Sequence, residues 1–257
     1  MGQMFSRIAL HLGDLRLPFR QAVREAARAG YGHVTISLGG EFEPGDLGQS
    51  ARREIAKILE HSRLRLAGVV LGKASGSLDE PERVDRCTED AMAAMELSRD
   101  LGGQWVLGRL GEPGPLAGEA LAHLASRADR AGGRFAASSG GDPARLTELF
   151  APLADAPVGL LADPAGWILQ GYRAHEALGR LGVVPAAAYV VDAARGEQRS
   201  GVVELGEGEL DLAAWERELL GRDLAGPQVV RARSMAEATR AATQLRELSG
   251  GLGWAGS

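Results

Sequence analysis

The sequence predicts an α/β protein folded as a single (βα)8 barrel, a TIM barrel. Short apolar runs rich in β-branched or small residues alternate with longer segments of helical periodicity, and there are eight of each. This alternation is typical of βα units around a parallel sheet. The chain has 257 residues, about the length that one such barrel needs. We therefore expect a barrel over residues 1–249 and a flexible glycine-rich tail over residues 250–257.

The eight predicted strands are short and mostly apolar, as strands buried on both faces are. They are expected at residues 7–12, 33–37, 65–71, 104–109, 133–138, 158–162, 186–191 and 227–231. Each is followed by a predicted helix, at about residues 18–29, 48–61, 82–101, 115–131, 142–153, 170–181, 211–221 and 234–249. Glycines end several helical runs, as at Gly30 and Gly132, and the spacing of Ser234 and Glu237 is typical of a capping box.

The composition argues against several classes of partner. The chain has 29 basic and 34 acidic residues and a net charge of −5, which gives no general electrostatic footprint for nucleic acid or an anionic membrane. Its single cysteine, Cys87, cannot form an intramolecular disulfide and fits a reducing compartment. No apolar run reaches the roughly 18 residues of a membrane span. We expect a cytoplasmic protein without nucleic-acid or membrane partners, and the sequence allows a homo-oligomer.

The catalytic candidates are polar residues that follow the strands, because the chemistry of a TIM barrel lies at the C-terminal ends of its strands. His11 is the only histidine at such an end and is the best candidate for proton transfer, although a lone histidine is often structural. Asp163 precedes a proline and could cap a helix, serve the site, or do both. Tyr189 could fill the upper barrel or act as a general acid.

The ligand-binding candidates are mostly arginines and hydroxyls. Arg231 and Arg233 directly precede the last predicted helix, where guanidinium groups and a helix start could bind phosphate or carboxylate. The alternative is that Arg231 is neutralised by Asp163 while Arg233 is solvated. The further candidates are Arg109, Ser138, Ser139 and Asp192. The two serines begin a segment, up to Asp142, that could bind an anion or form a plain turn.

Five segments together resemble one family. They are the stretch from Phe19 to Ile36, the segment from Ala94 to Gly108, Leu160 to Pro164, Tyr189 to Asp192, and Leu205 to Asp211. In these segments the chain resembles the xylose isomerase-like TIM barrels, the sugar-phosphate isomerase and epimerase superfamily. The resemblance implies the barrel fold, a carbohydrate ligand and, if the protein is active, isomerase or epimerase chemistry.

The resemblance also implies a divalent metal, Mn²⁺, Mg²⁺ or Zn²⁺, held by Glu, Asp, His and Glu after strands five to eight. These positions fall on Ser138 or Ser139, Asp163, Tyr189 and Arg231, so only Asp163 matches. A guanidinium about 4 Å from a divalent cation repels it by about 8 kcal/mol at an effective dielectric constant of about 20. We therefore predict no metal cofactor, with Arg231 in the cation's place and paired with Asp163.

Three functions are consistent with these residues. The first is a protein with a largely lost metal site that binds a small anionic metabolite, such as a sugar phosphate or sugar acid, without metal-dependent chemistry. The second is an active isomerase or epimerase whose metal site is completed by other residues, with Glu41 and Glu43 as candidates. The third, a nuclease-like protein, is disfavoured because it needs clustered histidine and acidic ligands and a basic face.

Overall fold

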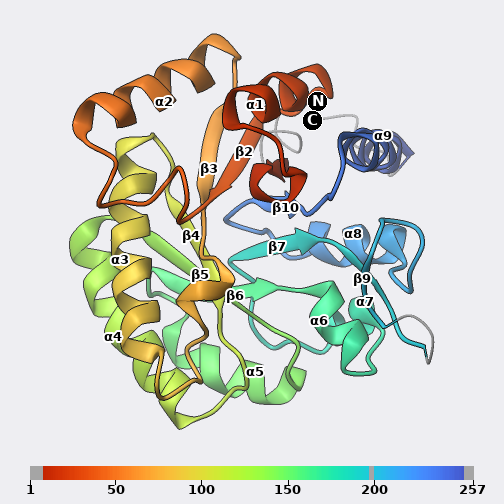
Figure 1. The fold of residues 1–257 in the computed structure, drawn as a ribbon. Coiled ribbons are helices and arrows are strands. Elements are labelled where there is room, and N and C mark those ends of the chain that lie inside the picture. The colour runs from red at the N-terminus through yellow and green to blue at the C-terminus, as the bar shows by residue number, and fades with distance from the viewer. Residues whose placement is uncertain (1–7, 197–199, 252–257) are drawn as a thin grey trace.

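The computed structural model describes residues 8–196 and 200–251 and shows a closed barrel of eight parallel strands (Figure 1). Around the barrel the strand order is β1-β10-β7-β6-β5-β4-β3-β2. The barrel strands are β1 (Ile8–His11), β2 (His33–Ser37), β3 (Arg65–Val70), β4 (Trp105–Arg109), β5 (Arg134–Ser139), β6 (Val158–Ala162), β7 (Ala187–Val190) and β10 (Gln228–Val230). All eight predicted strands are confirmed, and the fold is the single (βα)8 barrel that the sequence predicts.

Helices surround the barrel, as Figure 1 shows, and follow the strands in the predicted alternation. They are α1 (Phe19–Arg28), α2 (Gln49–His61), α3 (Val84–Asp100), α4 (Pro115–Ala131), α5 (Pro143–Phe150), α6 (Pro164–Leu169), α7 (Ala174–Gly179), α8 (Leu212–Leu220) and α9 (Met235–Gly251). Every residue of β1, β7 and β10 is buried, because the helices cover the outer face and side chains fill the interior.

The sixth βα unit differs from the prediction. Two short helices, α6 and α7, follow β6 in place of the single helix expected at residues 170–181. The first of them, α6, begins at Pro164, two residues after the end of β6. Gly171 lies between them with φ +98, a conformation that favours glycine and cannot continue a helix. Helical periodicity in the sequence detected α7 but not the short α6, which is stabilised by its cap and by tertiary packing.

A two-stranded antiparallel sheet, absent from the prediction, lies in the connection between β7 and α8. Its strands are β8 (Asp192–Ala194) and β9 (Gly201–Val203). At the other end of the chain, α9 continues through Gly251, so the first two residues of the predicted tail belong to this helix. Residues 252–257 of that tail lie outside the described residues.

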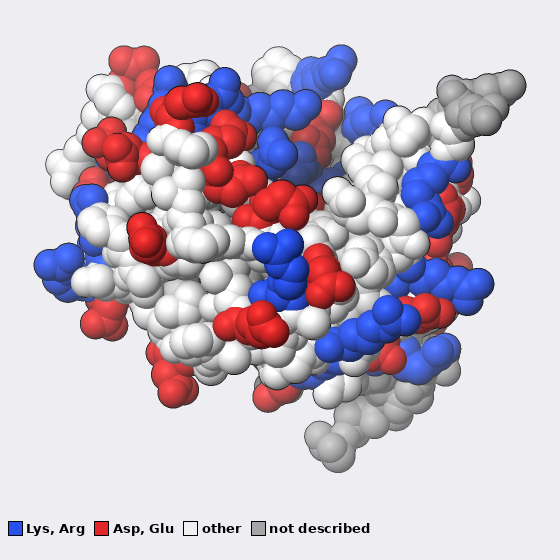
Figure 2. All heavy atoms as spheres, turned by 90° about the horizontal axis from the view of Figure 1, so that it is seen from below, with Lys and Arg blue, Asp and Glu red and all other residues white. Residues whose placement is uncertain are grey.

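Charge is mixed over the surface. Figure 2 shows acidic and basic side chains interspersed on one face, without a broad area of either sign. Within the described residues, no helix combines the length and the apolar character that crossing a bilayer requires.

Candidate functional site

The candidate site begins at the end of β1, where His11 is 2% exposed. Its Nδ1 atom lies 3.0 Å from Oγ1 of Thr35, and its Nε2 atom lies 3.2 Å from Oγ of Ser37. Both hydroxyls come from β2, which is the neighbour of β1 in the barrel. The imidazole at the C-terminal end of β1 is therefore held on both sides by hydroxyl groups of the adjacent strand β2.

Close packing fixes this arrangement. Gly13 lies in the short 3-10 helix η2 (Leu12–Leu15) that follows β1. A Cβ atom at Gly13 would collide with Oγ of Ser37 and would lie 2.8 Å from Nε2 of His11. The turn after β1 can approach the histidine this closely only because residue 13 has no side chain.

The centre of the site is Arg231, which follows β10. Its Nε atom donates to Oδ2 of Asp14 at 2.5 Å, and its Nη2 atom donates to Oδ1 at 3.0 Å. The guanidinium carbon lies 5.1 Å from the centre of the Tyr189 ring, which is the geometry of a cation–π contact. The expected ion pair of Arg231 with Asp163 is thus wrong: η2 brings the Asp14 carboxylate to the guanidinium in the two-point geometry that arginine prefers.

Asp163 is half-buried and caps α6, since its Oδ1 atom accepts a hydrogen bond from the backbone of Gly166 at 3.1 Å. Burial raises the pKa of its carboxyl group, and this rise is opposed by the backbone hydrogen bonds and by the positive charges of Arg231 and Arg109. Asp163 therefore acts as a helix cap and also lies in the electrostatic field of the two arginines. The sequence left open whether it was a cap or a site residue, and the geometry allows both roles.

Burial is the largest influence on the protonation of His11 and Tyr189. Burial and the nearby positive charge of Arg231 lower the pKa of His11 to about 3, although Asp14 lies 3.9 Å from its Nε2 atom. Burial raises the pKa of the Tyr189 hydroxyl to about 12, and Arg231 opposes the rise. At neutral pH the site thus contains a neutral imidazole and a protonated phenol. The phenol can donate a hydrogen bond but is a poor base.

Asp14 and Arg231 are both charged at neutral pH. Burial opposes ionisation of Asp14, but the hydrogen bonds from Arg231 and the positive charges of Arg231 and Arg233 lower its pKa overall. Burial also disfavours the charged form of Arg231, but Asp14, Tyr189 and Asp163 together raise its pKa. Arg233 is exposed beside the start of α9, where its backbone N–H donates to Glu237. The region therefore combines two carboxylates with Arg109, Arg231 and Arg233.

The two predicted serines are the last two residues of β5 but have different surroundings. The Ser139 hydroxyl donates to the carbonyl of Gly111 at 2.7 Å and accepts from the backbone N–H of Gly141 at 3.0 Å, so it shapes the loop. Asp142 ends that loop by capping α5. Ser138 is 8% exposed, and it lies beside Arg109 in the pairing of β5 with the adjacent strand β4. Ser138 and Arg109 thus lie together at the C-terminal end of the barrel.

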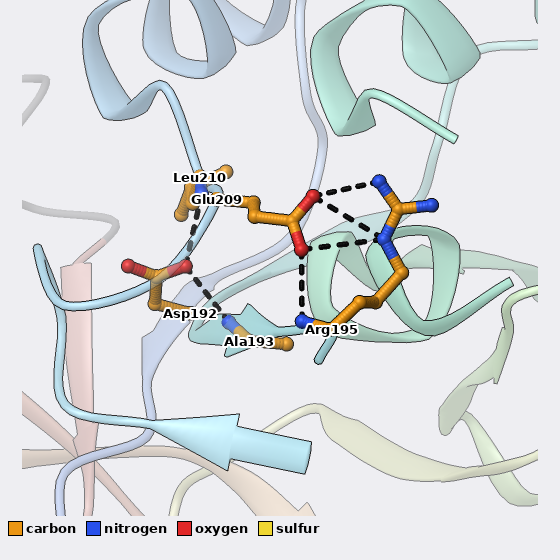
Figure 3. Close-up of polar contacts among 5 residues, drawn as sticks. All are labelled: Asp192, Ala193, Arg195, Glu209 and Leu210. Carbon is orange, nitrogen blue, oxygen red and sulfur yellow. Dashed lines mark hydrogen bonds and ion pairs between the residues drawn. The ribbon is translucent and has the colours of Figure 1, made fainter. Parts of the chain in front are cut away.

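Asp192 is placed as a scaffold of the connection between β7 and α8 (Figure 3). Its carboxylate is 1% exposed and accepts hydrogen bonds from four backbone N–H groups, at 2.8 to 3.0 Å. The donors are Ala193, Gly206, Gly208 and Leu210. A Cβ atom at Gly208 would collide with this carboxylate, which explains the glycine. Beside it, Glu209 forms two-point contacts with Arg195, so this arginine is already paired.

Asp14, Thr35 and Ser37 are the functional residues that sequence reasoning assigned no role. Ser37 ends a strand, Asp14 follows one and Thr35 lies two residues before a strand end, and this position was the available signal. Asp14 was not predicted as the partner of Arg231 because the two residues are 217 positions apart. Closure of the barrel between β1 and β10 brings them together.

Possible metal ligands are not grouped at this mouth among the described residues. Over residues 8–196 and 200–251, no three His, Cys, Asp or Glu side chains are grouped so that they could hold an ion. The position expected to supply the last carboxylate holds Arg231, whose charge repels a cation. The alternative donors Glu41 and Glu43 form no such group with other acidic or histidine residues there.

Several solved structures share this fold. A xylose isomerase domain protein from Planctomyces limnophilus superposes with a TM-score of 0.77 at 15% identity, covering 95% of this chain and 96% of the other. A xylose isomerase-like TIM barrel protein from Mycobacterium smegmatis in complex with magnesium gives a TM-score of 0.73 at 15% identity, covering 94% and 96%. D-allulose 3-epimerase from Methylomonas sp. in complex with D-allulose gives 0.69 at 17% identity, with the same coverages of 94% and 96%.

No family model matches the sequence, and no curated protein matches it either. The similarity is thus one of fold. The chain has the fold of the xylose isomerase-like TIM barrels and sugar epimerases, as its sequence motifs indicate.

Proposed function

We propose that this protein binds a small anionic carbohydrate derivative, a sugar phosphate or sugar acid, at the C-terminal mouth of the barrel without a divalent metal. The observation that carries the proposal is Arg231, which is held by Asp14 and Tyr189 where the resemblance would place a metal ligand. A fixed guanidinium supplies positive charge that needs no ion, and it can bind phosphate or carboxylate oxygens.

Each residue has a distinct part in this proposal. Arg231, with Arg233 and Arg109 at the rim, attracts the anionic group, and the start of α9 adds partial positive charge beside Arg233. The neutral His11 positions the hydroxyl groups of Thr35 and Ser37, and Ser138 offers a hydrogen bond to a sugar hydroxyl. The Tyr189 hydroxyl can donate a hydrogen bond to the ligand, and the Asp163 carboxylate can accept one from it. Proton transfer by His11 or Asp163 would make the protein a metal-independent isomerase or epimerase, and the fold shared with D-allulose 3-epimerase favours this second candidate.

Calorimetric titration tests the anion site. Inorganic phosphate, sulfate, a hexose phosphate and a hexuronic acid are titrated into wild type and into an Arg231→Ala, Arg233→Ala double variant. We expect binding by the wild type and at least about tenfold weaker binding by the variant, which is about 1.4 kcal/mol. An Arg134→Ala variant is the matched control, because Arg134 is exposed and begins β5 at the opposite end of the barrel. Equal affinities in all three proteins, or no binding to any, would refute the anion site.

Elemental analysis after dialysis tests the metal prediction. We expect less than about 0.1 equivalent of Mn, Mg, Zn or Co, because the three arginines at the mouth outnumber the two carboxylates, Asp14 and Asp163, and repel a cation. Near-stoichiometric metal that disappears in Asp163→Ala would instead support a metal-dependent isomerase or epimerase.

A further inference from the structure

Glu216 is a buried carboxyl group far from the chemistry proposed above. It lies in the middle of α8 and is 0% exposed. Within the described residues, neither of its carboxyl oxygens has a hydrogen-bond partner. The preceding residue, Trp215, packs edge to face on Trp167 of α6, with ring centres 6.0 Å apart. The carboxyl is therefore enclosed where α8 packs onto the molecule.

The nearest polar influence is Gln228, the first residue of β10. Its Oε1 atom is also buried and has no partner among the described residues. An ionised carboxylate has only acceptor atoms, so it could not bond to this oxygen. A protonated carboxyl has an O–H donor and could supply the missing hydrogen bond to Gln228. A proton on Glu216 would satisfy the Oε1 atom of Gln228, whereas Gln228 acting as a hydrogen-bond donor favours the ionised carboxylate and lowers the pKa of Glu216.

Among the described residues, no positive charge compensates an ionised Glu216. Burial raises its pKa and is the larger influence, while Gln228 as a hydrogen-bond donor opposes this rise. The neighbouring elements α6 and β10 contain no charged residue, and the only titratable residue of β7 is Tyr189. On α7, His175 is half-buried, and the exposed Glu176 is paired with Arg173 and Arg180. On α8 itself, Arg217 is exposed and Glu218 is half-buried near Gly179.

We propose that Glu216 is a neutral carboxylic acid in the folded protein and that its ionisation loosens α8 from the barrel. The packing of α8 on the barrel would therefore depend on pH. An unpaired charge in an apolar interior is strongly disfavoured, so ionisation and tight packing of α8 compete. The helix begins at Asp211, directly after the connection that Asp192 holds. Loosening of α8 would therefore reach the rim of the barrel mouth.

The direction of the pH effect follows from the proton balance. Burial raises the pKa of Glu216 from 4.5 to about 7. Between these two values the folded state keeps a proton that the unfolded state has lost, so rising pH favours unfolding. The stabilisation from this proton is complete below about pH 4.5 and is lost as the pH passes 7. Other groups titrate over the same range, so the test compares variants rather than absolute curves.

The first experiment measures the urea unfolding midpoint from pH 5 to 9 in wild type, Glu216→Gln and Glu218→Gln. Glutamine keeps the shape of the side chain and cannot ionise. We expect Glu216→Gln to lose the fall in midpoint between pH 5 and 8.5 and to exceed wild type at pH 8.5. Glu218→Gln, on the same helix, should keep the wild-type slope. Identical slopes in all three proteins would overturn the proposal.

A second measurement needs only the wild type, so it holds if Glu216→Gln fails to fold. The side-chain carboxyl carbon of Glu216 is followed by NMR as the pH rises, and amide exchange is followed in α8. We expect the carbon to titrate near pH 7 and the α8 amides to lose protection over the same range, relative to α4. A titration midpoint of the Glu216 carbon near pH 4.5, or unchanged protection of the α8 amides relative to α4, would contradict the proposal.

Discussion

Arg231 and Asp14 form the most informative residue pair in the molecule. The arginine is 29% exposed and the aspartate 25%, so both charges are largely removed from water. Paired charges in such positions stabilise less than their geometry suggests, but one of them alone is costly. The pair therefore explains why a guanidinium can occupy the barrel mouth, and it predicts the consequence of removing its partner.

We expect Asp14→Asn to reduce the free energy of unfolding by about 1 to 3 kcal/mol, because Arg231 would keep its charge and lose its acceptor. Urea unfolding at pH 7 measures the change. Glu54→Gln is the control, because its pair with Arg20 is exposed by 63% and 64% and should contribute less than about 1 kcal/mol. A change no larger than that of the control would show that Arg231 is not held by Asp14.

We expect the His11 imidazole to stay neutral down to about pH 4, since burial and Arg231 lower its pKa to about 3. In the unfolded chain a histidine takes up its proton near pH 6.5. Acidification from 6.5 towards 3 therefore favours unfolding through this residue. NMR of the ring, assigned by loss of the signal in His11→Asn, should show no titration between pH 8 and 4.5. The protein unfolded in urea is the control, and a native midpoint near 6.5 would contradict the prediction.

The connection between β7 and α8 shows how one buried residue can organise an element. It contains the β8–β9 sheet and the segment that returns to α8, and Asp192 joins the two through four backbone N–H groups. A carboxylate that accepts several backbone hydrogen bonds is a strong local constraint. Asp192 thus has a scaffold role, although the sequence placed it among the ligand-binding candidates.

We expect Asp192→Ala to reduce the free energy of unfolding by about 3 kcal/mol, because the substitution leaves four backbone donors without their acceptor. Amide exchange should increase most at Gly206, Gly208 and Leu210. Asp211→Asn serves as the control, since asparagine is as good a helix cap as aspartate. Unchanged exchange in this segment would show that other contacts hold the connection.

At the scale of the whole molecule, the closed barrel and its charge distribution decide which partners are accessible. Closure leaves no strand edge free in the barrel, so pairing with another chain through an edge is not available there. The net charge is −5, and acidic and basic side chains are mixed on the face seen in Figure 2. Arg109, Arg231 and Arg233 lie at one mouth of the barrel, where the proposed small anion would bind.

We expect no binding to a mixed-sequence DNA duplex at about 0.15 M salt, because affinity for the phosphate backbone requires several basic contacts on one face. Fluorescence anisotropy with a labelled 20-base-pair duplex measures this. A basic DNA-binding domain under the same conditions is the positive control. Binding that weakens steeply with salt would show a basic face and would reopen the nuclease-like function.

Local patterns in the sequence were sufficient for the architecture. Each barrel strand is a short apolar run that the flanking residues end, so all eight could be located from composition and periodicity. Caps could be predicted in the same way: Ser234 bonds to the N–H of Glu237, and Asp163 caps α6. These features depend on neighbours within a few residues, and a sequence displays them directly.

The partners of the site residues depend on contacts between distant segments, and only the tertiary structure decided them. Arg231 pairs with Asp14 rather than Asp163 because closure places the segment after β1 beside that after β10. His11 is neutral because packing buries it, and Asp192 is a scaffold because its loop folds back over it. A sequence shows which side chains lie at the strand ends, but burial and pairing arise from the closed barrel that brings those ends together.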